Sequence, residues 1–599
     1  MRSTALRHGT LLVVAILFTV VPATSISAQD LAILRAESLN EVISGFEEIS
    51  RATGQEISSE MVLGMAAGFT GKDPAEYLDL DRPIAIAMPV QGMMLQENGV
   101  VAAVPVTDAA AAIEVLANQF PNHTVDGELH SFTNESGPSL YLIATEDYVR
   151  VGGDADLVVN TDPLAAEATG TDLSLEIFLE PVAPMIEANL DSAKGMLESA
   201  VSMQEDVAYD PETMGTMFDF YLDGIRYILA NTSRLRITLD VDEGFVQFTK
   251  ALVPIPDSSL AVFIAAQEGG LPEIAKLANS DSAWYMAGRV TFGDEHKQGV
   301  KAFVDGYMDL MASVLESTGV ADSDASAGEE TQPQTSGFWA DYMSVMEQFS
   351  DRWVDCLRGD MVASFDLPEE GSFQFTEAFG INGGDACKQL VPEMGEEFAR
   401  AVAESETLSE VYTVEEGPRI GDSKSVVMTF DMMKMVEEMG TSVDQQGEKM
   451  MKALYGETMT GAISTVGDIV IAAGGENATD LLRGLVAASK GPGKAPSFAP
   501  LEVGPGLMMG INLGEILTWA KNAVPEDAEA IERAATALSG DAGRIPMAIK
   551  FENQVASFEM AVSLKTIETI NTAVEEEKAK TAAEGPEPEV VDETGETSP

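Results

Sequence analysis

The hydrophobic pattern of the chain predicts strands that run directly into helices. Residues 100–108 form an apolar run that is followed by a helical segment at 109–116. Later in the chain, residues 375–381 and 386–391 repeat this succession of strand and helix. A similar unit opens at residues 31–34, and its helix begins with the capping-box pattern Ser-Leu-Asn-Glu, which satisfies free amide groups at a helix start. The pattern therefore predicts a protein that mixes helices and strands.

Two further pairs of segments match between the two halves of the chain. Residues 148–153 and 469–475 are apolar strands that end in Gly-Gly and lead into a short helix. Residues 173–179 and 507–513 are apolar strands that run straight into a helix. The matching segments follow one order in both halves, which favours a tandem duplication.

Each half ends in a predicted hairpin. Residues 234–240 and 245–252 flank an Asp-Glu-Gly turn, and residues 545–551 and 555–564 flank a Glu-Asn turn. Acidic residues, Asn and Gly between strands are typical of hairpin turns. Because hairpins join antiparallel strands, we expect an α+β fold: a tandem duplication of a mostly antiparallel sheet with helices packed on one face.

Low-complexity segments suggest how the 599 residues are divided. One segment is rich in Ser, Gly, Pro and acidic residues, which is typical of a flexible linker, and the C-terminal segment has almost nothing to bury. We expect a signal peptide at 1–28, a first α+β half at 29–320, a flexible acidic linker at 321–337, a second α+β half at 338–574 and a disordered acidic tail at 575–599.

The N-terminus has the features of a secretory signal peptide. Arg2 and Arg7 precede the apolar run 11–21, and the small residues that follow end in Ala28, after which we expect cleavage. The apolar run is too short to span a bilayer, and no later segment offers about 18 consecutive apolar residues. We therefore expect a periplasmic or secreted protein without a transmembrane anchor.

The charge of the chain narrows the choice of partners. It has 35 Lys and Arg against 98 Asp and Glu, a formal net charge of −63. Binding to a phosphate backbone needs clustered Lys and Arg, so this balance argues against nucleic acid as a partner. An acidic surface also keeps a protein soluble in a saline medium, so the charge alone does not indicate a ligand.

Cys356 and Cys387 are the only two cysteines. An even number of cysteines in an exported chain predicts a disulfide, worth roughly 3–4 kcal/mol through loop closure. Two free thiols or a metal-binding pair are the alternatives.

Residue types for catalysis and metal binding are scarce. Beyond the signal peptide the histidines are His123, His130 and His296, and we expect the first two to be exposed loop residues because turn-like residues stand beside them. The chain has no zinc-protease, Walker A, nucleophile-elbow or Cys-x-x-Cys motif. Calcium held loosely on acidic loops, such as at Asp79 and Asp81, is an alternative to solvated turns. We assign no catalytic, cofactor-binding or metal-binding residue and expect no cofactor.

Bulky side chains recur at helical spacing just before Cys356. They are Phe338, Tyr342, Met346, Phe349 and Trp353. We expect this stripe to pack in the core of the second half, with a ligand groove or a partner surface as the alternative. A methionine stripe at 432–439 has the same spacing and favours core packing over a copper(I) site.

The first 250 residues resemble a group of large exported bacterial proteins of unknown function. The resemblance rests on the N-terminal strand and helix and on residues 81–88, 104–108 and 148–153. These segments are structural, so the resemblance implies export and a strand-helix architecture and carries over no catalytic residue.

Three functions remain as hypotheses. The first is an exported, non-catalytic envelope or secreted protein that binds an unknown protein or small-molecule ligand, or has a structural role. The second is a periplasmic carrier of a hydrophobic small molecule. The third is a hydrolase that uses paired carboxylates, which would need a cleft with two acids, one of them with a raised pKa.

Overall fold

The computed structural model describes most of the chain between residues 30 and 584. The described segments are 30–55, 57–90, 99–133, 139–165, 170–202, 211–242, 244–317, 335–368, 372–421, 423–434, 451–452, 454–523 and 528–584. The predicted signal peptide, residues 321–334 of the predicted linker and residues 585–599 of the predicted tail lie outside the described residues.

The described strands form two sets of ten along the chain. The first set is β1 (Asp30–Ala36), β2 (Ile84–Pro89), β3 (Val101–Pro105), β4 (Asn122–Asp126), β5 (Leu129–Thr133), β6 (Leu140–Ala144), β7 (Tyr148–Gly152), β8 (Leu173–Phe178), β9 (Thr232–Asp242) and β10 (Phe245–Pro254). The second set is β11 (Trp284–Arg289), β12 (Leu357–Asp366), β13 (Gln374–Ile381), β14 (Tyr412–Ile420), β15 (Ser423–Asp431), β16 (Thr458–Val466), β17 (Ile469–Gly474), β18 (Gly506–Asn512), β19 (Arg544–Glu552) and β20 (Val555–Ser563).

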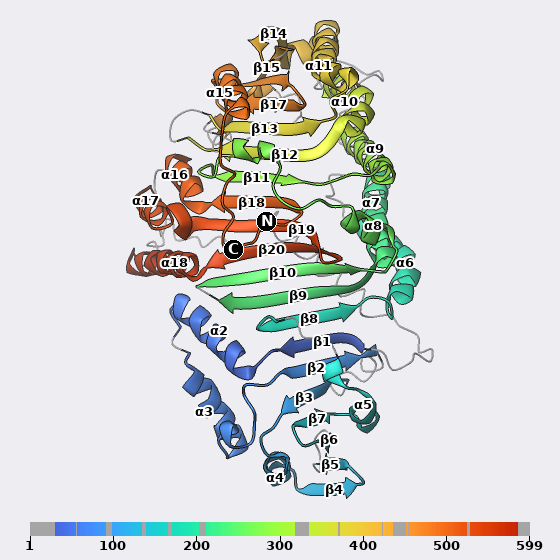
Figure 1. Cartoon of the computed structure of the whole chain (residues 1–599), viewed down its shortest axis with the longest axis vertical. Helices are drawn as coiled ribbons and strands as arrows, with labels where there is room; N and C mark the ends of the chain where they lie inside the picture. The colour runs from blue at the N-terminus through green and yellow to red at the C-terminus, as the bar shows by residue number, and fades with distance from the viewer. Residues whose placement is uncertain are drawn as a thin grey trace, which may run out of the picture.

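All of these strands belong to one continuous sheet (Figure 1). From one edge to the other, the first set has the order β4-β5-β6-β7-β3-β2-β1-β8-β9-β10. The second set continues as β20-β19-β18-β11-β12-β13-β17-β16-β15-β14. The two sets meet where β10 pairs with β20. Every pairing is antiparallel, as the predicted hairpins indicated.

The second set repeats the order of the first. Read from its outer edge, the second set has the order β14-β15-β16-β17-β13-β12-β11-β18-β19-β20. Each strand number is ten higher than that of the strand at the same place in the first set. The four pairs of segments that match in the sequence fall on β3 and β13, β7 and β17, β8 and β18, and the two hairpins β9–β10 and β19–β20. β11 precedes the predicted linker, yet it lies among the strands of the second set, between β18 and β12.

The helices occupy corresponding places between the strands. In the first part of the chain they are α2 (Leu39–Ala52), α3 (Ser59–Thr70), η1 (Pro74–Glu76), α4 (Ala109–Gln119), α5 (Ala155–Asn160), η4 (Pro163–Ala165), α6 (Ala183–Ser202), α7 (Pro211–Asn231), α8 (Ser259–Ala265) and η5 (Glu273–Leu277). In the second they are α9 (Asp294–Ser317), α10 (Thr335–Cys356), α11 (Asp385–Glu404), α12 (Glu406–Val411), α15 (Ala478–Lys490), α16 (Leu513–Ala523), α17 (Ala528–Ala537), η7 (Gly540–Gly543) and α18 (Leu564–Glu584).

Helices pack against both faces of the sheet, which differs from the one-sided arrangement that we expected. Val149 on β7 packs with Val115 of α4, whereas Val101 on β3 packs with Leu157 of α5 on the opposite face. At the other end of the sheet, α11 and α15 also lie on opposite faces. Apolar runs such as 101–105 have no polar side, so the sequence alone does not indicate which face a following helix covers.

Local sequence features explain several element ends. Ser38 caps α2 by accepting a hydrogen bond from the backbone N–H of Glu41, as the capping-box pattern predicts. The β19–β20 hairpin turns through Asn553 and Gln554, both with positive φ, which a two-residue turn of this kind requires. α18 continues to Glu584, so the first part of the predicted disordered tail is helical. Its Ala, Glu and Lys residues favour a helix.

None of the described helices combines the length and the apolar character that crossing a bilayer demands.

Candidate functional site

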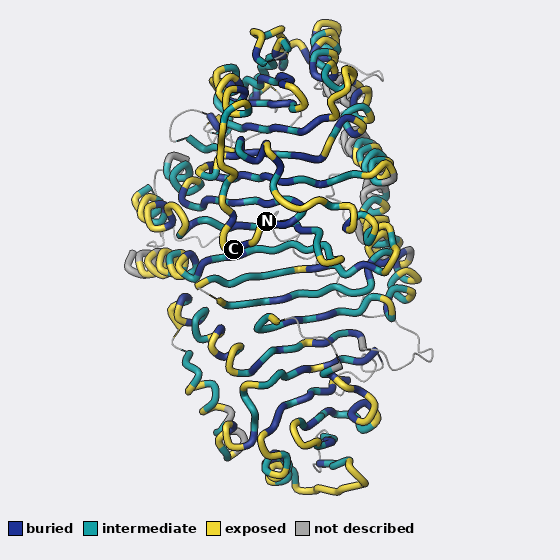
Figure 2. The backbone as a smooth tube through the Cα atoms, viewed as in Figure 1, coloured by how far each residue is buried: buried dark blue, intermediate teal, exposed yellow. Residues whose placement is uncertain are grey.

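Along the central strands, buried residues alternate with half-buried ones (Figure 2). Met508 on β18 and Ala548 on β19 lie directly opposite each other and are fully buried. Their neighbours Met509 and Met547 also lie opposite each other, but on the other face, and they are only half-buried. Because side chains alternate along a strand, this pattern distinguishes a covered face from a second, partly exposed face.

The covered face is closed by segments that precede and follow the central strands. Ile274 and Leu277 of η5, Leu482 of α15 and the nearby Phe498 pack in one cluster with buried side chains of β11, β12, β18 and β19. Tyr285 on β11 is fully buried in this cluster. This is the main core of the molecule.

The opposite side of the central strands, which we call the apolar face, carries almost only apolar side chains. They are Ile86 on β2; Leu34 on β1; Leu173, Leu175 and Ile177 on β8; Leu235, Ile237 and Leu239 on β9; Val246, Phe248 and Leu252 on β10; Phe558, Met560 and Val562 on β20; Ile545, Met547 and Ile549 on β19; Leu507, Met509 and Ile511 on β18; Trp284 and Met286 on β11; and Met361 and Phe365 on β12. All of them are half-buried or exposed, and Leu34, Ile86 and Phe365 each expose 37% of their surface.

A row of methionines crosses the middle of this face. Met560, Met547, Met509 and Met286 lie on four neighbouring strands, and each is the register partner of the next. Phe248 on β10 extends the row on the far side of Met560. Methionine side chains are unbranched and flexible, so such a row adapts to ligands of irregular shape.

The two ends of the apolar face are covered by helices. Val104 and Val149 pack under α4 at the β3–β7 end, and Val426 and Val470 pack under α11 at the β15–β17 end. Along one border α2 approaches β9 so closely that a Cβ at Gly45 would lie 3.2 Å from Val241. The exposed part of the apolar face therefore lies over the middle of the sheet.

Polar and charged side chains are concentrated on the covered face instead. Glu176 on β8 is buried and accepts hydrogen bonds from Arg234 and Arg236 on β9, at 3.2 and 2.7 Å. Lys550 on β19 is buried and forms an ion pair of 2.7 Å with Glu559 on β20. A water-facing antiparallel sheet normally shows the reverse distribution, with its polar side chains toward solvent.

A second buried carboxylate lies between two arginines at β11 and β12. Asp360 is buried and accepts hydrogen bonds from Arg289 and, at 2.6 and 2.9 Å, from Arg358. The carboxylate pairs with two cations on the covered face, as that of Glu176 does.

Two charged residues interrupt the apolar face between β2 and β13. Lys250 on β10 is exposed, and its side chain has no hydrogen bond or ion pair with any other residue of the described segments. Glu377 on β13 is half-buried between Ala363 and Ala472, and this burial raises the pKa of its carboxyl group above the ordinary value.

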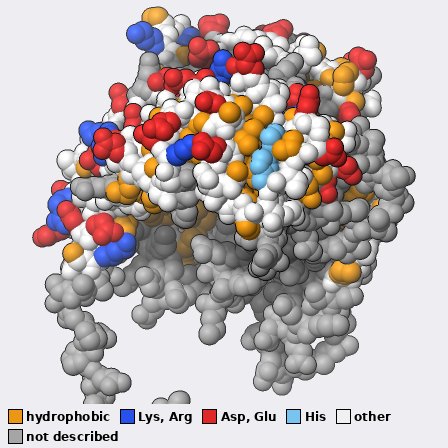
Figure 3. All heavy atoms as spheres, turned by 90° about the horizontal axis from the view of Figure 1, so that it is seen from below, with side chains coloured by type: hydrophobic (Ala, Val, Ile, Leu, Met, Phe, Trp, Pro, Cys, Tyr) orange, Lys and Arg blue, Asp and Glu red, His pale blue; other side chains and the backbone are white. Residues whose placement is uncertain are grey.

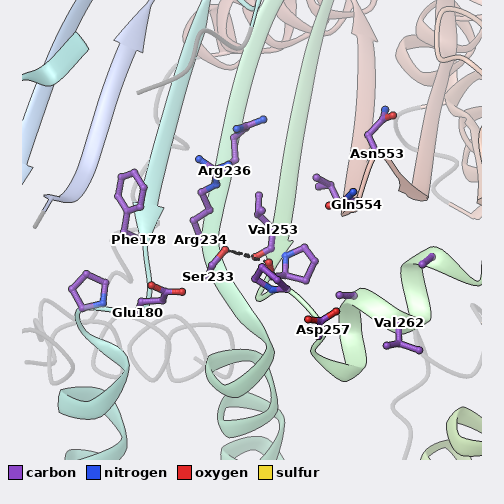
Figure 4. Close-up of a pocket in the computed structure, with 16 residues that line it drawn as sticks. Phe178, Glu180, Ser233, Arg234, Arg236, Val253, Asp257, Val262, Asn553 and Gln554 are labelled. Atoms are coloured by element: carbon purple, nitrogen blue, oxygen red, sulfur yellow. Dashed lines mark hydrogen bonds between the residues drawn. The ribbon is translucent and has the colours of Figure 1, made fainter. Parts of the chain in front are cut away.

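A separate pocket of about 950 Å³ opens on the covered face, where the two sets of strands meet (Figure 4). Arg234 and Arg236 line it from β9, and Asn553 and Gln554 line it from the β19–β20 turn. Glu176 pairs with both arginines, and Glu180 and Asp257 also line the pocket, so the arginines offer a ligand little uncompensated charge. The volume lies in the range of small-molecule sites.

His123 and His130 lie on strands rather than in the loops that we expected. They belong to β4 and β5, with their rings stacked at 5.3 Å and His123 Nε2 3.0 Å from His130 Nδ1. Figure 3 shows the histidines among apolar side chains at this end of the molecule. Partial burial, with a smaller effect of His123, lowers the pKa of His130.

Cys356 and Cys387 are joined by a disulfide whose sulfurs lie 2.06 Å apart. The bond connects the end of α10 to the start of α11. Phe349 is buried and Trp353 half-buried beside Cys356, in the cluster that we expected for the aromatic stripe. The side chains of Phe338, Tyr342 and Met346 and most of the methionine stripe lie outside the described residues.

The acidic residues of the described segments do not form a metal-binding cluster. No three His, Cys, Asp or Glu side chains in these segments converge as metal ligands. Asp81 instead accepts a hydrogen bond from Asn40, and Asp79 pairs with Arg82. Asp366 and Glu377, two carboxyl groups whose pKa burial raises, lie on opposite faces of the sheet.

Comparisons with protein-family models, with curated proteins and with solved structures gave no match to this chain.

Proposed function

We propose that this protein is an exported, non-catalytic binding protein that holds the acyl chains of a lipid-like ligand on the apolar face of its sheet. The observation that carries the proposal is the inverted arrangement of the sheet, with ion pairs on its covered face and apolar side chains on its partly exposed face. Exposing a contiguous apolar surface is unfavourable in water, and such surfaces mark binding sites.

The dimensions of the apolar face suit a long ligand. Ten strands from β2 to β12 contribute to it, which corresponds to about 43 Å at the usual strand spacing. This length exceeds the roughly 30 Å hydrocarbon thickness of a bilayer. Each methylene group of an acyl chain that moves from water onto this face contributes up to about 0.8 kcal/mol.

The proposed location of the protein outside the cytoplasm rests on the sequence and on the disulfide. The N-terminal features of a signal peptide and the Cys356–Cys387 bond both fit an oxidising compartment, periplasmic or extracellular. A ligand with low solubility in water needs a protein carrier in such a compartment.

Binding of methyl palmitate, an uncharged ester with a long acyl chain, tests the proposal by native mass spectrometry. We expect the wild-type protein to bind the ester, and the double variant Met509→Gln, Met547→Gln to bind it about tenfold more weakly, because two amides replace thioethers in the row that contacts the chain. The matched control is Met61→Gln, Met65→Gln on α3, where both methionines are exposed, and it should bind like the wild type.

Two results would contradict the proposal. One is a wild-type protein that binds no methyl palmitate. The other is a wild-type dimer that the Met509 and Met547 substitutions dissociate, because the apolar face would then be covered by a second copy of the chain.

We also propose that the sheet arose by tandem duplication. The repeated strand order supports this, and so does the pairing of the two sets. Thr249 is the fifth residue of β10 and Glu559 the fifth residue of β20, and the two are register partners. Equivalent positions that face each other are what a two-fold relation between two copies produces. Structures of the two segments expressed separately would contradict the duplication if they adopted different strand orders.

A further inference from the structure

The side chain of Lys250 is an isolated cation in the middle of the apolar face. Its register partners are Ile237 on β9 and Phe558 on β20, and Phe248 and Leu252 flank it on the same face of β10. It is exposed, and it has no partner within the described part of the chain. The carboxylate of Glu377, the other charged group of this face, lies six strands away along the sheet.

An exposed ammonium group without an acidic partner is available to pair with the charged group of a ligand. The chain has 35 basic and 98 acidic residues, so acidic partners are plentiful. Most basic side chains described here pair with acids. Lys250 does not. An unpaired ammonium beside an apolar surface favours an amphiphile whose charged group is an anion.

We infer that the ligand of the apolar face is a long-chain fatty acid, with its carboxylate bound to Lys250 and its acyl chain lying across the methionine row. This inference rests on the proposed function and names the chemical class of its ligand. The charge complementarity between the ammonium group and a carboxylate selects this occupant over an uncharged lipid.

The surroundings of Lys250 favour a carboxylate over a phosphate head group. A lysine ammonium is a compact charge that matches one monoanion. Phosphate groups are usually bound by several donors, often an arginine fork or backbone N–H groups. Ile237, Phe558, Phe248 and Leu252 supply no such donors, so a phosphate on this face would be held by one ammonium group alone.

The acyl chain has a continuous path from Lys250 toward β11. Met560, Met547, Met509 and Met286 lie along that direction, one on each successive strand. The distance from β10 to β11 is about 19 Å at the usual strand spacing. One leaflet of a bilayer, half of its roughly 30 Å hydrocarbon core, is about 15 Å thick, so a membrane acyl chain fits this path.

Binding of palmitic acid and of methyl palmitate to four forms of the full-length protein tests the inference. The forms are the wild type, Lys250→Gln, Lys250→Arg and the control Lys494→Gln, which changes an exposed lysine in the segment between α15 and β18. Titrations are followed by calorimetry at pH 8.

We expect the wild type to bind palmitic acid more tightly than its methyl ester. Lys250→Gln should weaken the binding of palmitic acid about tenfold and leave that of the ester unchanged, which corresponds to the loss of one charged hydrogen bond. Lys250→Arg should retain most of the affinity, and Lys494→Gln all of it.

The outcomes separate the two proposals. Equal affinity of the wild type for the acid and the ester, or an unchanged affinity of Lys250→Gln for the acid, would overturn the role of Lys250 while the proposed function stands. Failure of the wild type to bind either compound would overturn the proposed function itself. Tighter, Lys250-dependent binding to phosphatidylglycerol vesicles than to palmitic acid would overturn the assignment of a carboxylate.

Discussion

Lys250 lies directly opposite Phe558 across the β10–β20 pairing that joins the two sets of strands. An exposed ammonium group therefore neighbours a half-buried aromatic ring in the middle of the apolar face. The pair combines one charge with a large apolar surface, as recognition of an amphiphile requires. It also lies beside Thr249 and Glu559, which are register partners, so strands of both sets contribute to the proposed site.

Two adjacent methionines on β18 test the assignment of the two faces. Met508 is fully buried on the covered face, whereas Met509 is half-buried on the apolar face. We expect Met508→Gln to lower the free energy of unfolding by about 3 kcal/mol, because it places an amide in the core. Met509→Gln should change it by no more than about 0.5 kcal/mol. Urea denaturation of both variants measures the difference, and similar losses for both would contradict the assignment.

The buried carboxylate of Asp360 stabilises the covered face through its ion pairs with Arg289 and Arg358. Asp360→Asn removes the negative charge that pairs with Arg289 and Arg358. We expect the free energy of unfolding to fall by about 2 kcal/mol. The loss is smaller than for a fully buried ion pair because Arg358 is partly solvated. The matched control is Glu268→Gln, which removes an exposed partner of the same Arg289. It should cost less than about 1 kcal/mol. A control variant as unstable as Asp360→Asn would disprove this explanation.

Glu377 makes the stability of the protein depend on pH. Burial raises the pKa of this carboxyl group above its ordinary value of 4.5, so the folded state holds the proton more tightly than the unfolded state. The stability that this provides is complete below the unfolded pKa and is lost as the pH rises through the folded pKa. Glu377→Gln, which stays neutral, should therefore raise the melting temperature more at pH 7 than at pH 4. An equal increase at both values would show that burial of the charge is not the cause.

His130 should make stability depend on pH in the opposite direction, so that stability falls as the pH falls. Burial and His123 lower its pKa below 6.5, so the unfolded state binds the proton more tightly. The stability of the β4–β5 hairpin is then complete above the unfolded pKa and is lost as the pH falls toward and through the folded pKa. Hydrogen exchange of the β5 amides should become faster between pH 7 and 5.5, after correction for intrinsic rates, and less so in His130→Gln. An identical change in both proteins would contradict this.

The strands and hairpins could be predicted from the sequence because each leaves a local signal. The turn at Asn553 and the cap at Ser38 depend on residues within a few positions of one another. The continuous sheet could not be predicted, since the β10–β20 pairing joins residues more than 300 positions apart. No local pattern specifies that contact.

The candidate site was also missed, for a related reason. In Arg544–Glu552 the apolar residues Ile545, Met547 and Ile549 alternate with more polar positions that include Arg544 and Lys550, a pattern that normally indicates that the apolar side faces the core. Only the structure shows that Met509 and Met547 remain half-buried while Met508 and Ala548 are covered. The local sequence feature that points to the proposed site is the single charge of Lys250 within a strand of mostly apolar residues.

Photo-crosslinking with a palmitic acid analogue that carries a diazirine at the end of its acyl chain tests the central claim most directly. After irradiation and peptide mapping, we expect the label on residues of the apolar face, above all Met509, Met286 and Trp284, and much less label in the presence of excess palmitic acid. Label confined to the pocket beside Arg234 and Val262, or no label that palmitic acid displaces, would contradict the claim that the apolar face holds the ligand.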